Sequence, residues 1–306
     1  MNKFIRWFNK NQKVLILGII AIVFIILILQ VLNSFAKKDK DNKKEVQSNT
    51  QNNLSKSVIS DDKLIEPLYN NNKKIIEEFT EYCNSGNIES AYDLITKDCK
   101  EVLFGNIEKF KSNYYESIFN KNRKCVVQYW DDGIYEVKYS EDSLSTGKSR
   151  LSNSITDYIK IYNENGKSKL SINGFLGKKK IDKKKTIKNV TINILNRYSY
   201  MDYETYDIEI KNNSGETLIL DNLNEIGTMY LLDKKNTKHY SINSEIVKDN
   251  LIVQDAHESI ASIKFDNPYI KDRKIEKIVF SNVGIGHDER YGSKPYINIL
   301  NFEIEL

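Results

Sequence analysis

The chain has 306 residues and a formal net charge of +4, but its basic side chains are unevenly distributed. Residues 1–60 hold ten Lys or Arg and three Asp or Glu, which leaves 36 basic and 39 acidic side chains in residues 61–306. Because a nucleic-acid-binding domain needs positive charge on its folded surface, this balance argues against a nucleic-acid partner.

The first predicted element is an apolar stretch, Val14–Leu32, which contains no charged residue. A helix of this length covers about 28 Å, close to the hydrocarbon thickness of a bilayer, so we predict one transmembrane helix in contact with lipid. Residues 1–13 then form a cytoplasmic head. Lysines flank both sides of the span, but long domains translocate largely regardless of such charges, so we expect an extracytoplasmic C-terminal part. The alternative is a signal peptide cleaved after Ala36.

The polar segment 33–61 has too few large apolar side chains to fold, and we expect a flexible linker there. Beyond it we predict two domains, 62–178 and 186–306, joined by a lysine-rich connector at 179–185. The chain is long enough for both.

Apolar residues at steps of three and four predict three helices between Pro67 and Ile118. Asn87 and Asn106 are suited to cap the second and third of them, and we expect the second to continue through Ile95 to Cys99. After these helices, apolar and polar residues alternate, and Asp131-Asp132-Gly133 and Asn165-Gly166 suit tight hairpin turns. Three helices followed by about four antiparallel strands predict an α+β domain.

The segment Phe79–Leu94, with an apolar helix end, the stop Asn84-Ser85-Gly86-Asn87 and the run Glu89-Ser90-Ala91-Tyr92-Asp93-Leu94, carries a family resemblance. It resembles the nuclear-transport-factor-two-like (ketosteroid-isomerase-like) domains, in which a curved sheet wraps a helix into a cone with a pocket. Some members of that family are enzymes. Many are binding or assembly modules, including the single-span inner-membrane assembly component of conjugative secretion systems. The resemblance therefore implies a cone-like domain with a binding or assembly role.

The isomerases of that family use a pocket Asp as a base, with Tyr or Asp donors to an enolate oxygen. Asp157 shares a strand face with Ile155 and Ile159, so it could point into the cone near Tyr135 or Tyr139. Alternatively, the strand begins later and Asp157 lies in water at the open rim, since a shift of one residue exchanges the two faces. We expect no catalytic residue, and Asp157 with the two tyrosines is the enzyme alternative.

Six lysines occupy the eight residues of Lys178–Lys185. The pattern is typical of a solvated connector, and the alternative is electrostatic attraction to an anionic polymer at the cell surface. Downstream, the short alternating strands of residues 186–306 predict an all-β sandwich. The strands Tyr206–Lys211, Met229–Asp233, Ser262–Pro268 and Lys277–Asn282 make this domain similar to the immunoglobulin-like domains of Gram-positive surface proteins.

Three tyrosines, Tyr198, Tyr200 and Tyr203, crowd the entry to one strand and could form a stacking patch for sugar or peptide. The alternative is an ordinary aromatic end of a sandwich. Two clusters, Asp255–Glu258 and His287–Glu289, lack the spacing of known metal motifs, so we expect no metal and no cofactor.

The three cysteines, Cys83, Cys99 and Cys125, are interpreted as small apolar residues without a structural disulfide. The sequence as a whole favours a membrane-anchored, extracytoplasmic binding or assembly protein of a Gram-positive-type envelope, with envelope proteins as partners. A conjugation or secretion apparatus is one assembly that the resemblance suggests. The alternatives are a small-molecule pocket enzyme and a cell-wall glycan-binding sensor.

Overall fold

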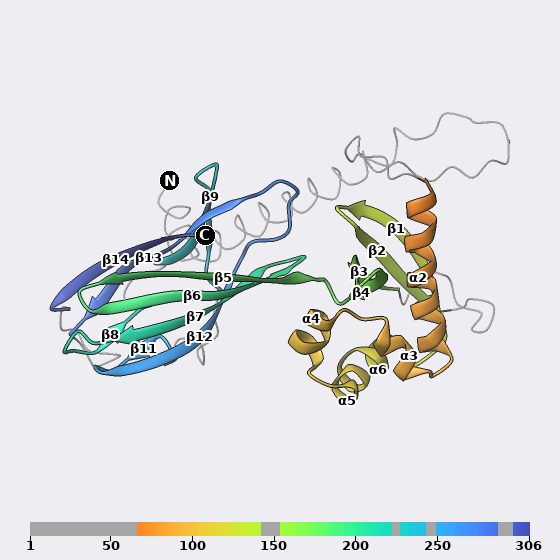
Figure 1. Cartoon of the computed structure of the whole chain (residues 1–306), viewed down its shortest axis with the longest axis horizontal. Helices are drawn as coiled ribbons and strands as arrows, with labels where there is room; N and C mark the ends of the chain where they lie inside the picture. The colour runs from red at the N-terminus through yellow and green to blue at the C-terminus, as the bar shows by residue number, and fades with distance from the viewer. Residues whose placement is uncertain (1–65, 142–153, 222–226, 243–248, 287–295) are drawn as a thin grey trace, which may run out of the picture. The chain divides into compact units, whose positions relative to one another are not determined.

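Strands make up most of the folded chain in the computed structural model, with a group of helices at its start (Figure 1). The structure describes residues 66–141, 154–221, 227–242, 249–286 and 296–306. The predicted membrane segment, the linker and the cleavage site at Ala36 lie outside these residues. Among the helices that are described, none is both long and apolar enough to cross a bilayer.

The helical part begins with one long helix and continues in short helical segments. They are α2 (Glu66–Asn84), α3 (Ile88–Asp93), α4 (Lys97–Cys99), a π-helical turn (Lys100–Phe104), α5 (Ile107–Phe110), a second π-helical turn (Lys111–Tyr115) and α6 (Glu116–Ile118). The two predicted caps are confirmed. The side chain of Asn87 accepts from the backbone N–H of Ser90 at 3.3 Å, and that of Asn106 accepts from Lys109 N–H at 2.9 Å.

The expectation of one continuous second helix up to Cys99 is wrong. The chain leaves the helix after α3, and Ile95 forms a parallel bridge with Leu170. Thr96 N–H donates to the Leu170 carbonyl at 2.8 Å, and the Thr96 hydroxyl then caps α4 by accepting from Cys99 N–H at 3.2 Å. Pairing with a strand 75 residues later overrides the local helical periodicity.

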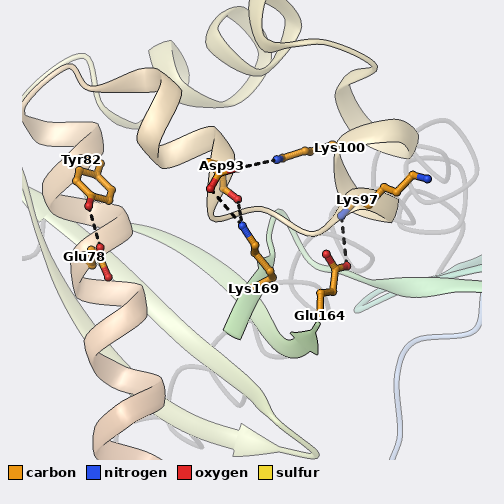
Figure 2. Close-up of polar contacts among 7 residues, drawn as sticks. All are labelled: Glu78, Tyr82, Asp93, Lys97, Lys100, Glu164 and Lys169. Carbon is orange, nitrogen blue, oxygen red and sulfur yellow. Dashed lines mark hydrogen bonds and ion pairs between the residues drawn. The ribbon is translucent and has the colours of Figure 1, made fainter. Parts of the chain in front are cut away.

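Polar contacts reinforce this junction between the helices and the hairpin that follows (Figure 2). The Lys169 ammonium lies 3.4 Å from the Asp93 carboxylate, and Lys100 approaches the same carboxylate at 4.0 Å. The backbone N–H of Lys97 donates to the Glu164 carboxylate at 3.3 Å. The Asp93 side chain is 79% exposed, so we interpret these contacts as surface ion pairs that contribute little to stability.

The first sheet is antiparallel, in the order β1-β2-β3-β4. Its strands are β1 (Arg123–Asp131), β2 (Ile134–Glu141), β3 (Ile155–Glu164) and β4 (Lys167–Ser171). Both predicted tight turns are confirmed, because Asp132 and Gly133 have φ of 46° and 73°, and Asn165 and Gly166 have 53° and 79°. Positive φ at both central residues is what a two-residue hairpin with the right twist requires. One face of this sheet packs against the helices around Phe79, Phe110 and Tyr114.

The lysine-rich segment predicted as a connector is a strand. It lies within β5 (Phe175–Ile187), which pairs along its length with β6 (Val190–Tyr200). Phe175 is fully buried in the core of the helical domain, whereas Ile181 and Ile187 pack against the core of the following domain. The two apolar cores therefore share one continuous strand, and both lie within one compact unit, Lys63–Leu306.

The remaining strands form two sheets around a common core. One sheet has the order β12-β7-β6-β5; the other has β10-β9-β13-β8-β11, with β14 also paired to β13. Their bounds are β7 (Glu204–Asn212), β8 (Leu218–Ile219), β9 (Met229–Asp233), β10 (Lys238–Tyr240), β11 (Ile252–Val253), β12 (His257–Phe265), β13 (Ile275–Ile285) and β14 (Asn298–Glu305). The cleanest alternation is that of β7, where every second residue is buried. Apolar side chains of both sheets meet in one cluster, as the prediction of a β-sandwich requires.

Candidate functional site

Asp157 points into the helical domain, on the face that the sequence pattern assigned to it. It lies on β3 directly opposite Val137 of β2, and its side chain is buried. The rim alternative, with Asp157 in water, is therefore wrong. The carboxylate accepts three hydrogen bonds: from the Tyr114 hydroxyl at 2.7 Å, and from the backbone N–H groups of Asn173 and Gly174 at 3.1 Å each.

Burial controls the protonation of this group. It raises the pKa of Asp157 from 3.8 to about 6, although the three donated hydrogen bonds act in the opposite direction. Burial, followed by the nearby Asp157 carboxylate, raises the pKa of Tyr114 and of Tyr139 well above the ordinary value, so both keep their phenolic protons at neutral pH. Tyr135 lies further along, where its hydroxyl accepts from the Asn72 side chain at 2.9 Å.

The contacts of Asp157 give it a structural task. Asn173 and Gly174 have φ of 58° and 66°, so they form the tight turn that leads from β4 into β5. The carboxylate ties down both backbone N–H groups of this turn, and its remaining contact goes to a tyrosine of the helical layer. A carboxylate occupied by protein donors on both oxygens is poorly placed to accept a proton from a substrate.

The three tyrosines proposed as a stacking patch already contact other side chains of the protein, which limits the ring surface left for a sugar or peptide. Tyr198 donates from its hydroxyl to the Asp207 carboxylate at 2.6 Å. Tyr200 and Tyr203 stack on each other, with ring centroids 4.4 Å apart. The ring centroid of Tyr200 also lies 5.2 Å from that of Phe175. The structure therefore brings Tyr200 and Tyr203 together and uses Tyr200 to close the core of the helical domain.

A hollow of about 400 Å³ lies beside β5, within the compact unit Lys63–Leu306. It is lined by residues from the β1–β2 turn, from β3, from the paired strands β5 and β6, from the starts of β7 and β13, and from the loop after β12. Five cationic side chains line it, against the three carboxylates of Asp132, Glu204 and Asp272. The cations are Lys160, Lys178, Lys179, Arg197 and Arg273.

Sequence reasoning singled out the β5 lysines at this hollow but missed its arginines. Arg197 and Arg273 come from β6 and from the loop before β13, and no local pattern links them. No group of three or more His, Cys, Asp or Glu side chains is arranged to hold a metal within the described ranges, and His287–Glu289 falls outside them.

The cysteines are free thiols with little reactivity. Cys83 and Cys99 are buried and Cys125 is half-buried. Burial raises the pKa of Cys99 to about 12 and also raises the pKa of the other two. Since the thiolate is the nucleophile, none of these groups is poised for covalent chemistry at neutral pH.

Comparisons with protein-family models, with curated proteins and with solved structures gave no match to this chain.

Proposed function

We propose that this chain is a non-enzymatic binding or assembly protein of a Gram-positive-type bacterial envelope, held at the membrane through Val14–Leu32, with the two domains outside the cell. Envelope proteins are its partners, and a conjugation or secretion apparatus is the kind of assembly suggested by the cone-like resemblance of Phe79–Leu94. The second domain supplies an immunoglobulin-like sandwich of the kind that surface proteins use as a binding module.

The observation that carries the non-enzymatic part of this proposal is the satisfied carboxylate of Asp157. Both of its oxygens are engaged, by Tyr114, Asn173 and Gly174, so the side chain fixes the turn into β5. The rival enzyme function rests on the raised pKa of Asp157, about 6, which would suit a general base. Geometry favours the structural role, because a base must reach a substrate proton and this carboxylate is already bound by the protein.

The lysines of β5 support a contact with the envelope. The six lysines of Lys178–Lys185 are exposed, and β5 is an edge strand of its sheet. Lys185 donates to the carbonyl of Glu303 at 3.1 Å on the neighbouring edge strand β14, and Lys180 pairs with Asp182 at 3.4 Å. The other lysines keep their charge available for an anionic polymer of the cell surface, an attraction that salt would screen.

The test is protease digestion of intact cells that carry the chain with a C-terminal epitope, followed by capture of the epitope from mild detergent. We expect loss of the epitope without lysis and co-capture of subunits of a membrane complex. Protection of the epitope in intact cells, with digestion after lysis, would place the domains inside the cell. Digestion with a capture that contains only the bait would contradict the assembly role.

A further inference from the structure

The hollow beside β5 has the composition of a site for a small anion. Its volume, about 400 Å³, falls within the usual range for small-molecule sites. Among its charged side chains, Lys160 is neutralised by Asp132 at 2.8 Å. The Glu204 carboxylate accepts from the hydroxyls of Tyr206 at 2.9 Å and Ser199 at 3.2 Å. The cations that remain outnumber the carboxylates that could neutralise them.

Two of these cations are direct cross-strand neighbours. Lys179 of β5 is directly opposite Arg197 of β6, so their side chains leave the sheet on the same face. Like charges in this arrangement destabilise a sheet unless a counter-ion lies between them. The Nε of Arg197 lies 3.8 Å from Glu204 and is buried without a hydrogen-bond partner in the part of the chain that the structure describes, while the guanidinium also interacts with the Tyr206 hydroxyl.

Arg273 supplies a guanidinium that is already held in position. Its Nη1 donates to the Asn267 side chain at 2.6 Å and to the Pro268 carbonyl at 3.0 Å, both neutral acceptors. No carboxylate among the described residues pairs with this guanidinium. Its Nε and Nη2 groups therefore keep three N–H donors, in the planar arrangement that recognises a carboxylate or phosphate with two parallel hydrogen bonds.

Tyrosine side chains lie around this positive centre, and the hydroxyl of one of them, Tyr162, donates to the Leu176 carbonyl. Tyr162, Tyr200 and Tyr269 line the hollow, and burial raises the pKa of Tyr162 and of Tyr269 to about 12. Their hydroxyls are therefore protonated at neutral pH. Beside them, Gly177 has φ of +135°, and a Cβ there would lie 2.8 Å from the Tyr162 hydroxyl. The backbone of β5 thus approaches the Tyr162 hydroxyl as closely as only glycine allows.

We propose that this hollow binds a small molecule through a phosphate or carboxylate group, which lies between the Lys179–Arg197 pair and the fork of Arg273. The tyrosine rings and Pro268 contact the rest of the ligand. This site is separate from Asp157, and it depends neither on the location of the chain nor on its protein partners.

The test is calorimetric titration of the full chain in neutral detergent at about 0.15 M ionic strength, where long-range attraction is screened. Glycerol 3-phosphate and inorganic phosphate serve as phosphate probes, and succinate serves as the carboxylate probe. We expect saturable binding of at least one probe. The probe that binds shows whether the site prefers a phosphate or a carboxylate group. Lys179→Gln and Arg273→Gln should each weaken it about tenfold, the effect of losing one charged hydrogen-bonding partner.

Lys184→Gln is the matched control. Lys184 lies on the same strand and is exposed, but it faces away, opposite Asn193, and does not line the hollow. We expect this variant to bind as the unmodified chain does. If Arg273→Gln unfolds through loss of its loop contacts, Lys179→Gln still tests the site, because Lys179 is exposed and has no ion pair among the described residues. Absence of saturable binding up to about 10 mM of every probe would overturn the proposal, and so would equal weakening by Lys184→Gln.

Discussion

Raising the pH from 4 to 7 should remove a stabilising contribution of the buried Asp157 carboxyl group. Burial raises its pKa from 3.8 to about 6, so the folded chain holds this proton more tightly than the unfolded chain does. The stabilisation is therefore complete below pH 3.8 and is lost as the pH rises through 6. A difference of about two pH units corresponds to about 3 kcal/mol of unfolding free energy.

The measurement is urea unfolding of the full chain in neutral detergent at a series of pH values, followed by circular dichroism. The reference is Asp157→Asn, which cannot ionise, while Asp182→Asn controls for the change in net charge because Asp182 is exposed. Asp157→Asn places an amide donor against one of the N–H groups of Asn173 and Gly174, which adds a constant penalty. The test therefore depends only on how the difference in unfolding free energy between the unmodified chain and Asp157→Asn changes with pH.

The free energy of unfolding of the unmodified chain, relative to Asp157→Asn, should fall by about 3 kcal/mol between pH 3.8 and 6 and stay level above. Asp182→Asn should show the same pH dependence as the unmodified chain. A relative stability that rises across this interval would refute the reasoning. It would mean that the three donors, from Tyr114, Asn173 and Gly174, stabilise the charged carboxylate more than burial destabilises it.

Substitutions at a close backbone contact and at a helix cap test local structure, each beside a matched control variant. Gly177→Ala should destabilise the chain by about 2–3 kcal/mol, because its φ is +135° and the added Cβ would meet the Tyr162 hydroxyl; Gly215→Ala, with φ of +89° and open space, should cost only about 1 kcal/mol. Equal losses in urea unfolding would contradict the close contact with Tyr162. Asn106→Ala should cost about 1 kcal/mol by removing the cap on Lys109 N–H, and Asn106→Asp should retain that stability. If Asn106→Asp lost as much as Asn106→Ala, the cap would not contribute.

Features that depend on neighbouring residues could be predicted from the sequence. The caps at Asn87 and Asn106 and the turns at Asp132-Gly133 and Asn165-Gly166 each arise from side chains and φ angles within a few residues. The alternation of β7 likewise predicted a half-buried strand, because every second side chain faces the same side. Local geometry suffices for such features, so no knowledge of the distant chain was needed.

The interior position of Asp157 was predictable only in part. The period of two placed it on the apolar face, but its burial depends on Tyr114, which is 43 residues away and belongs to the helical layer. Its second role, holding the turn at Asn173 and Gly174, had no signal in the sequence near Asp157. Burial by distant elements decides whether a carboxylate on that face is a rim group, a base or an anchor.

The lysine-rich segment Lys178–Lys185 shows most clearly where prediction from local sequence fails. Its composition alone indicates a solvated connector, yet pairing with β6 makes it a strand, and Phe175 and Ile187 fix its two ends in different cores. Likewise, only the fold brings Lys179 opposite Arg197 and places Arg273 nearby. The sequence by itself determined the elements and which of their faces are apolar. The tertiary structure decided the split of the second helix and the charged hollow, because both depend on contacts between residues far apart in the chain.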